Sequence, residues 1–238
     1  MSKYRISAIS YTNTKPFVYG IQHSGLAEKI DLVFDIPAVC AQKLIEDKAD
    51  IGIVPVAALL YINDYHIISD YCIGATGPVN SVFIFSDKPI EEIKSLQLDS
   101  QSRTSNNLAK VLLKNYWKNT PDFVDSNADA FVEIGDRTFG KKDKFRFVYD
   151  LAEEWIKFTG LPFAFAVWAS NKPISEEFVR EFNVALKYGV EHRREVINTI
   201  PKRSDFDFED YLMHRIDYDL DQAKREAVGK YLELVKAL

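Results

Sequence analysis

The first 55 residues decide the fold. Three apolar segments follow one another there: YRISAISY (residues 4–11), LVFDI (32–36) and DIGIVP (50–55). Each has the alternating or continuous apolar character of a buried strand. Helical segments separate them, beginning near Lys15 and at Pro37, and a further helix is expected from Val56 because proline favours a first helical turn. This alternation predicts an α/β fold built on a parallel sheet covered on both faces.

A second α/β unit follows the first along the chain. We expect a short helix over residues 89–93, a helix after Ser102, one over 151–158, and strands at 81–86, 96–99, 131–136 and 163–168. Beyond these, the pattern predicts helices only, the last one including Leu220. The predicted lobes are residues 1–82 plus 171–238 (lobe 1) and the inserted residues 83–170 (lobe 2). Two strands crossing between lobes form a hinge, so the interlobe cleft is the expected ligand site.

Composition excludes several classes of protein. The chain has 238 residues, 47% hydrophobic and 27% charged, which excludes a disordered or low-complexity protein. A formal charge of −5 argues against nucleic acid as a partner, and any anionic ligand needs local donors. The sequence has no run of 18 apolar residues and no secretory h-region after Met1, so we expect no membrane partner and a cytoplasmic location.

Motifs for metals, nucleotides and common hydrolases are absent from the sequence. It contains no CxxC, HExxH, GxSxG, GxxxxGK[ST] or GxGxxG, so we predict no metal site and no dinucleotide or P-loop chemistry. Cys40 and Cys72 have apolar neighbours and are predicted to be reduced core thiols.

The strongest local pattern is Ser102-Arg103-Thr104-Ser105, which precedes an amphipathic helix. Free N–H groups, hydroxyls and the helix dipole favour a carboxylate or phosphate at such a position. Arg103 could add a bidentate contact. The alternative is that Ser102 only caps the helix and Arg103 faces solvent.

A second candidate site is the segment from Ser10 to Pro16, at the carboxyl end of the first strand. Ligands of α/β proteins bind at this edge of the sheet, and the Asn13 amide can both donate and accept hydrogen bonds. The alternative is an ordinary turn with a capping asparagine. The backbone at Val56, after Pro55, also reaches this edge, although such a segment is more often pure core. The residues alone do not choose between binding and catalysis.

Taken in order, six segments resemble the chorismate dehydratase family of the futalosine route to menaquinone. They are residues 9–17, 50–58, 73–82, 102–105, 134–136 and 150–163. Thr12 stands where leucine is more usual in the family, but Asn13 is retained. The resemblance implies a type II periplasmic-binding-protein fold with a central interlobe cleft.

The resemblance also implies an activity. A carbon–oxygen lyase would remove water from chorismate, a small dicarboxylate, and give 3-[(1-carboxyvinyl)oxy]benzoate without a cofactor. Asn13 and Ser81 would be the catalytic residues. Our own hypothesis for the base, which the residues leave open between a protein group and the substrate, is the enolpyruvyl carboxylate of the substrate itself. The substrate-binding residues would be Ser10, Tyr11, Val56, Arg103, Thr104 and Ser105.

Three other functions remain to be weighed against this one. The sister enzyme 1,4-dihydroxy-6-naphthoate synthase shares the implied fold, but the segment from Tyr11 to Phe17 favours the dehydratase. A solute-binding protein of a transporter would be expected to carry a signal peptide. An effector-binding regulator domain is disfavoured because no helix-turn-helix precedes the strand at Tyr4.

Overall fold

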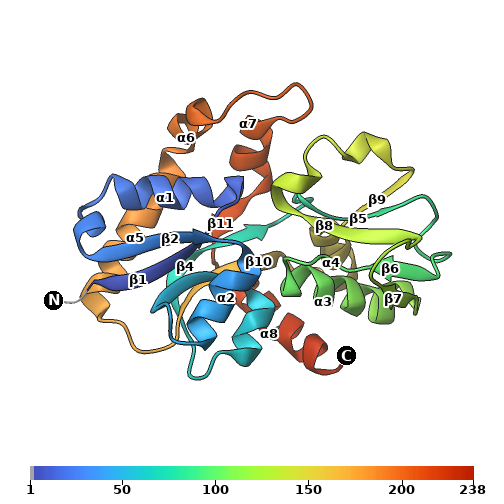
Figure 1. The fold of residues 1–238 in the computed structure, drawn as a ribbon, viewed down its shortest axis with the longest axis horizontal. Helices are drawn as coiled ribbons and strands as arrows, with labels where there is room; N and C mark the ends of the chain where they lie inside the picture. Colours follow the sequence, from blue (N-terminus) through green and yellow to red (C-terminus); the bar gives the residue numbers. More distant parts are fainter. Residues whose placement is uncertain (1–2) are drawn as a thin grey trace.

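Two β-sheets, one in each lobe, organise residues 3–238, the part of the chain that the computed structural model describes (Figure 1). The strand order is β11-β4-β10-β3-β1-β2 in the six-stranded sheet and β7-β6-β8-β5-β9 in the five-stranded sheet. The first sheet contains β1 (Tyr4–Ile9), β2 (Ile30–Asp35), β3 (Ile51–Pro55), β4 (His66–Ala75), β10 (Phe163–Ser170) and β11 (Asp217–Asp219). The second contains β5 (Val82–Ser86), β6 (Ser95–Gln97), β7 (Asp122–Val124), β8 (Ala130–Ile134) and β9 (Phe147–Asp150).

The first sheet is mixed, whereas the sequence predicted a parallel one. Strand β1 pairs in parallel with β2 and β3, as the strand–helix alternation predicted. Strand β10 comes back from the second lobe and enters between β3 and β4, antiparallel to both. Strand β11 adds a further antiparallel edge against β4. The prediction of helices only after residue 168 was therefore wrong, because three residues reading Asp-Tyr-Asp show no alternation long enough to recognise.

Helices cover both faces of the first sheet (Figure 1). On one face lie α1 (Lys15–Gln22) and α5 (Glu176–Glu191), with α6 (Arg193–Thr199) and α7 (Phe208–Asp210) above them. On the other lie α2 (Pro37–Ile45) and α8 (Gln222–Lys236). The core between sheet and helices includes aromatic contacts, with Phe17 edge-on to Trp168 and Trp168 edge-on to Phe182. Cys40 and Cys72 are buried free thiols, as predicted.

The second lobe has its two main helices, α3 (Arg103–Leu112) and α4 (Leu151–Thr159), on one face of its sheet (Figure 1). An aromatic cluster of Phe85, Phe131 and Phe145 fixes the segment after β8 against the strands. The predicted helix over residues 89–93 is absent: this segment forms a turn. Its carbonyls at Ile90 and Ile93 accept hydrogen bonds from the Asn119 amide instead. The segment Val56–Tyr61 is a 3-10 helix.

Two short connections join the lobes. One runs from β4 to β5 through residues 76–81, and the other runs from α4 to β10 through residues 160–162. Strand β10 pairs along its length within the first sheet, so residues 163–170 belong with that sheet and not with the inserted lobe. The other lobe boundaries stay a prediction.

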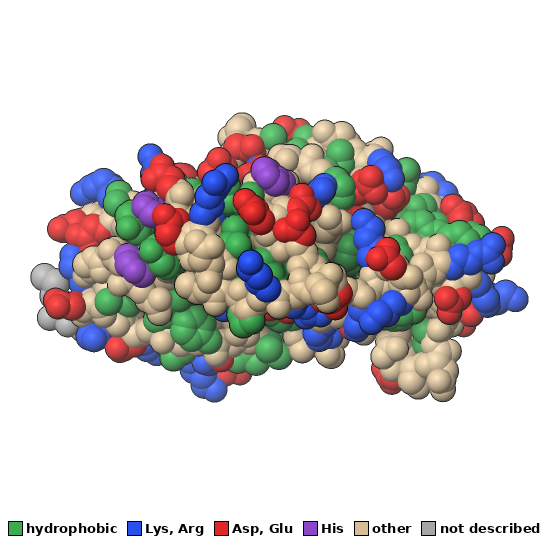
Figure 2. All heavy atoms as spheres, turned by 90° about the horizontal axis from the view of Figure 1, so that it is seen from above, with side chains coloured by type: hydrophobic (Ala, Val, Ile, Leu, Met, Phe, Trp, Pro, Cys, Tyr) green, Lys and Arg blue, Asp and Glu red, His purple; other side chains and the backbone are tan. Residues whose placement is uncertain are grey.

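Basic and acidic side chains are interspersed over the face that Figure 2 shows, in line with the modest net charge. Within residues 3–238, no helix combines the length and the apolar character needed to cross a membrane.

Candidate functional site

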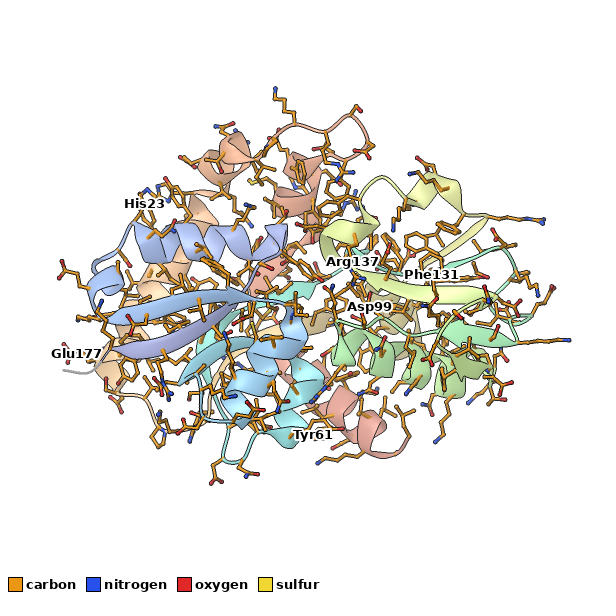
Figure 3. All side chains as sticks on the ribbon, viewed as in Figure 1. His23, Tyr61, Asp99, Phe131, Arg137 and Glu177 are labelled. Atoms are coloured by element: carbon orange, nitrogen blue, oxygen red, sulfur yellow. The ribbon has the colours of Figure 1, made fainter. Side chains whose placement is uncertain are left out.

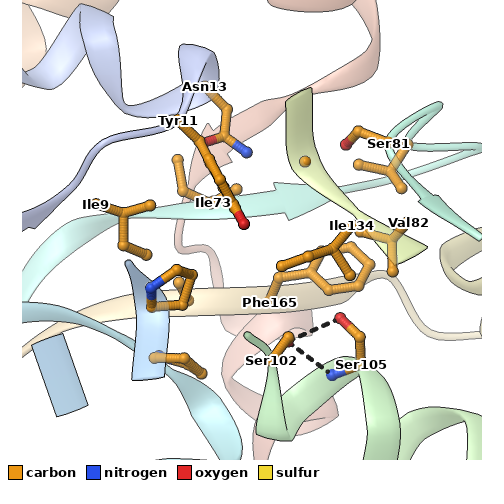
Figure 4. Close-up of a pocket in the computed structure, with 15 residues that line it drawn as sticks. Ile9, Tyr11, Asn13, Ile73, Ser81, Val82, Ser102, Ser105, Ile134 and Phe165 are labelled. Carbon is orange, nitrogen blue, oxygen red and sulfur yellow. Dashed lines mark hydrogen bonds between the residues drawn. The ribbon is translucent and has the colours of Figure 1, made fainter. Parts of the chain in front are cut away.

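A pocket lies between the lobes, at the carboxyl ends of β1 and β3 and at the N-terminus of α3 (Figure 4). The space between its lining residues is about 480 Å³ when the open mouth is included. Its polar lining residues are Tyr11, Asn13, Ser81, Ser102 and Ser105. The rest of the lining is apolar or glycine, and it includes Ile9, Val82, Ile134 and Phe165. No carboxylate, imidazole or amine side chain is among these described lining residues.

Asn13 is held in the pocket wall by the turn that connects β1 to α1. It lies in a 3-10 turn, Thr12–Thr14, and only 9% of its surface is exposed to solvent. The Asn13 side chain makes no cap to α1, so the alternative of a capping asparagine is wrong. Its Nδ2 donates to the Tyr211 hydroxyl at 3.3 Å, and its Oδ1 accepts from the Thr14 hydroxyl at 3.3 Å. Its backbone carbonyl accepts from the Tyr218 hydroxyl at 2.9 Å.

Ser81 is the last residue of the connection from β4 to β5, and it faces Asn13 across the upper end of the pocket (Figure 4). Its hydroxyl oxygen accepts a hydrogen bond from Tyr211 at 2.9 Å, and its carbonyl accepts from the Gly135 N–H at 2.7 Å. Tyr211 is fully buried, and burial raises the pKa of its phenol well above the usual value. The phenol therefore stays protonated and acts as a hydrogen-bonding link, not as an acid or base.

The N-terminus of α3 forms the lower end of the pocket (Figure 4). Ser102 is the N-cap: its hydroxyl accepts from the Ser105 N–H at 3.1 Å and donates to the Ser105 hydroxyl at 3.0 Å. Both side chains line the pocket. A helix N-terminus carries partial positive charge and favours an anion, so this end suits a carboxylate.

Four of the predicted binding residues do not line this pocket. Arg103 is exposed, and its guanidinium lies 5.4 Å from the centre of the Tyr61 ring. Thr104 is buried, and its hydroxyl accepts from the Ala57 N–H at 3.0 Å. The reason is helical geometry, since consecutive residues of a helix point about 100° apart. Ser105 consequently faces the pocket, Arg103 faces solvent, and Thr104 joins α3 to the first lobe.

The other two predicted residues, Ser10 and Val56, also lie outside the lining of this pocket. Ser10 is exposed and lines a neighbouring groove along α1. Val56 is fully buried core, so the core alternative holds for its side chain. By contrast, the structure brings together Tyr11, Asn13, Ser81 and Ser105 from distant parts of the sequence.

Polar contacts join the lobes around the pocket. The Thr12 hydroxyl donates to Asp136 at 2.8 Å, and the Tyr11 hydroxyl donates to the Gln101 side chain. Burial raises the pKa of Tyr11. Arg137 and Asp99, 2.5 Å apart, lie on the side of the second lobe that faces the first (Figure 3). Asp136 thus accepts a hydrogen bond from Thr12, and Asp99 is paired with Arg137.

Gly135 allows Tyr11 to pack against β8, and its replacement gives a testable prediction. Gly135 has a φ of +63°, and a Cβ there would lie 2.6 Å from the Tyr11 ring. We expect Gly135→Ala to destabilise the fold by about 1–2 kcal/mol through backbone strain and by about 1–3 kcal/mol more through overpacking. Urea unfolding measures this effect.

Gly160→Ala is the matched control for this prediction. Gly160 has a similar φ of +74°, but no atom lies within 4 Å of its Cβ position. It should show the backbone strain alone. Equal losses of stability in the two variants would contradict a tight Tyr11–Gly135 contact.

Sequence reasoning missed two residues of the site. Tyr211 lies 198 positions from Asn13 along the chain, in a helical segment without a motif. Ser102 belonged to the predicted anion-binding pattern but was not named among the substrate-binding residues, although its capping position is what places it at the pocket. Among residues 3–238, no group of three or more His, Cys, Asp or Glu side chains is placed to hold a metal ion.

This two-lobed α/β fold with an interlobe pocket is that of the periplasmic binding proteins, as the resemblance implied. A Candida albicans protein described as having the generic periplasmic binding protein fold matches with a TM-score of 0.64 at 13% identity, covering 100% of this chain and 91% of that one. A solved structure from Archaeoglobus fulgidus matches with a TM-score of 0.73 at 15% identity, covering 99% and 97%.

The sequence comparison is more specific than the fold. The chain belongs to the menaquinone biosynthesis family, whose profile matches residues 4–237. It is 25% identical to the chorismate dehydratase of Thermus thermophilus, over 85% of this chain and 83% of that protein.

Proposed function

We propose that this protein is a chorismate dehydratase, a hydro-lyase that converts chorismate to 3-[(1-carboxyvinyl)oxy]benzoate and water in menaquinone biosynthesis by the futalosine route. Membership of the menaquinone biosynthesis family and similarity to the Thermus thermophilus enzyme support this proposal.

The observation that carries the proposal is the distribution of donors in the pocket. Asn13 and Ser81 lie at one end, Ser102 and Ser105 with the α3 N-terminus lie at the other, and apolar side chains lie between them (Figure 4). Chorismate has the matching form, because its two carboxylates are borne on an unsaturated carbon skeleton. Neutral hydrogen-bond donors in a largely apolar pocket bind carboxylates more strongly than they would in water.

The lining also bears on the mechanism. Elimination removes the proton at ring carbon 3, and the resulting electron pair delocalises into the ring carboxylate. Loss of the hydroxyl at carbon 4 as water then makes the ring aromatic. In our proposal, the Ser102 and Ser105 end holds the ring carboxylate as charge builds there. Because no strong base is among the described lining residues, in our proposal the enolpyruvyl carboxylate takes the proton. It then passes this proton to the departing carbon 4 hydroxyl, which leaves as water.

Asn13 and Ser81 then have a positioning task. In the proposed mechanism they hold the enolpyruvyl carboxylate, or the departing hydroxyl, in the conformer in which that carboxylate reaches the proton. Fixing one reactive conformer lowers the barrier by making the proton transfer intramolecular.

The direct test mixes the purified protein with chorismate and follows ultraviolet absorbance and mass. We expect loss of one water and appearance of an aromatic product. Saturable binding with unchanged chorismate would contradict the proposal and favour a solute-binding protein.

A further inference from the structure

Tyr211 links the two residues that we place at the upper end of the pocket, yet it comes from neither of their segments. It begins the π-helical segment Tyr211–Arg215, near the C-terminus, and only 1% of its surface is exposed to solvent. Its ring packs edge-on against Phe139 of the second lobe and Phe206 of the first, with ring centres 5.4 Å and 5.3 Å apart. This packing from both lobes fixes the position of its hydroxyl.

The hydrogen bonds at that hydroxyl have one consistent direction. Tyr211 has a single O–H, and it donates to the Ser81 oxygen at 2.9 Å. Its oxygen accepts from the Asn13 Nδ2 at 3.3 Å, while the Asn13 Oδ1 accepts from Thr14. Thr14 therefore donates to Asn13, Asn13 donates to Tyr211, and Tyr211 donates to Ser81.

This direction determines what the pocket offers to a ligand. Because Ser81 accepts from Tyr211, its own O–H is free to point into the pocket as a donor. One N–H of the Asn13 amide donates to Tyr211, and this bond holds the amide nitrogen at the upper end of the pocket. The second N–H of the amide is then free to donate to a ligand. Without the Tyr211 hydroxyl, the Asn13 amide could turn its oxygen toward the ligand, and Ser81 could present lone pairs. Either change would repel a carboxylate.

We propose that Tyr211 is a positioning residue, which holds Asn13 and Ser81 as hydrogen-bond donors toward an anionic group of the substrate. This inference rests on the proposed function for the identity of the substrate. The orientation of the two side chains can be tested independently of turnover.

The test compares Tyr211→Phe with Tyr231→Phe. Tyr231 is a matched control, since it is also fully buried and its hydroxyl also donates one hydrogen bond, at 2.9 Å to the Thr104 carbonyl. In metal sites, groups that orient a ligand contribute about 10- to 100-fold, and we expect Tyr211→Phe to lower kcat for chorismate by the same order. We expect KM to change less and Tyr231→Phe to retain wild-type kcat.

The second readout is the pair of NMR signals from the Asn13 side-chain amide, assigned by their loss in Asn13→Ala. They should shift in Tyr211→Phe and stay in place in Tyr231→Phe. Binding of 3-[(1-carboxyvinyl)oxy]benzoate, measured by calorimetry, should weaken only in Tyr211→Phe. The amide signals do not depend on turnover, so a wild-type protein inactive on chorismate would overturn the proposed function and leave the test of Tyr211 valid.

Unchanged Asn13 amide signals together with wild-type kcat in Tyr211→Phe would overturn the inference and reduce Tyr211 to a packing residue. If circular dichroism shows Tyr211→Phe to be unfolded, Ser81→Ala replaces it. Loss of the Ser81 acceptor should redirect the Tyr211 O–H toward Asn13 and shift the same amide signals. Signals that stay in place in folded Ser81→Ala would also overturn the inference.

Discussion

Replacement of Asn13 by alanine is expected to lower kcat for chorismate by about 100-fold or more, the range found for a positioned donor in an active site. The amide lies in the pocket wall, and Tyr211 and Thr14 fix its orientation. A donor that aligns the reacting carboxylate or the departing hydroxyl acts mainly in the transition state, so KM should change less than kcat. Steady-state kinetics measure both.

Asn13→Asp is the sharper variant, because it keeps the size of the side chain and adds a negative charge. That charge would face a dianionic substrate, and we expect turnover to fall at least as far as in Asn13→Ala. Asn183→Ala is the control. Asn183 is a partly buried asparagine outside the pocket lining, and its Oδ1 accepts from Ser69 and from the Asp70 N–H. It should lose stability and keep its turnover. An Asn13→Ala protein with wild-type kcat would exclude Asn13 from catalysis.

The largest effect on stability is expected from Gly189→Ala. Helices α1 and α5 touch through their backbones at this point: a Cβ on Gly189 would lie 1.8 Å from the Pro16 carbonyl oxygen, and one on Gly20 would lie 1.9 Å from the Ala185 carbonyl oxygen. Because the obstacle is backbone and not a flexible side chain, the helices must separate. We expect a loss of about 3 kcal/mol or more, which corresponds to a fall in Tm of about 6–12 °C for a chain of this length.

Gly229→Ala is the matched control for this prediction, since Gly229 is an exposed glycine within α8 with no atom within 4 Å of its Cβ position. It should stabilise the protein by up to about 1 kcal/mol through helix propensity. Gly189→Ala should also reduce turnover, because Pro16 lies in the first turn of α1, the helix that directly follows the Asn13 turn. A Tm close to wild type in Gly189→Ala would show that α1 and α5 are not in backbone contact.

Local patterns were sufficient for much of the fold. Strands β1, β2 and β3 and the helices between them follow from apolar periodicity and from the prolines at positions 16 and 37. Ser102 was recognisable as a cap because its bond to the Ser105 N–H spans only three residues. Asn13 and Ser105 could be placed near a ligand because the carboxyl ends of strands and the N-termini of helices point to the same edge of an α/β lobe.

The sequence by itself thus determined the two-lobed α/β class, the segments that face the cleft and the family resemblance. Only the tertiary structure decided which side chains point into the pocket, since Ser105 and Arg103 share one motif but face opposite ways on α3. It also decided the antiparallel entry of β10 and the partnership of Asn13, Ser81 and Tyr211. The physical reason is that helical phase and hydrogen-bond direction depend on neighbours that folding brings from far along the chain. No local pattern contains those neighbours.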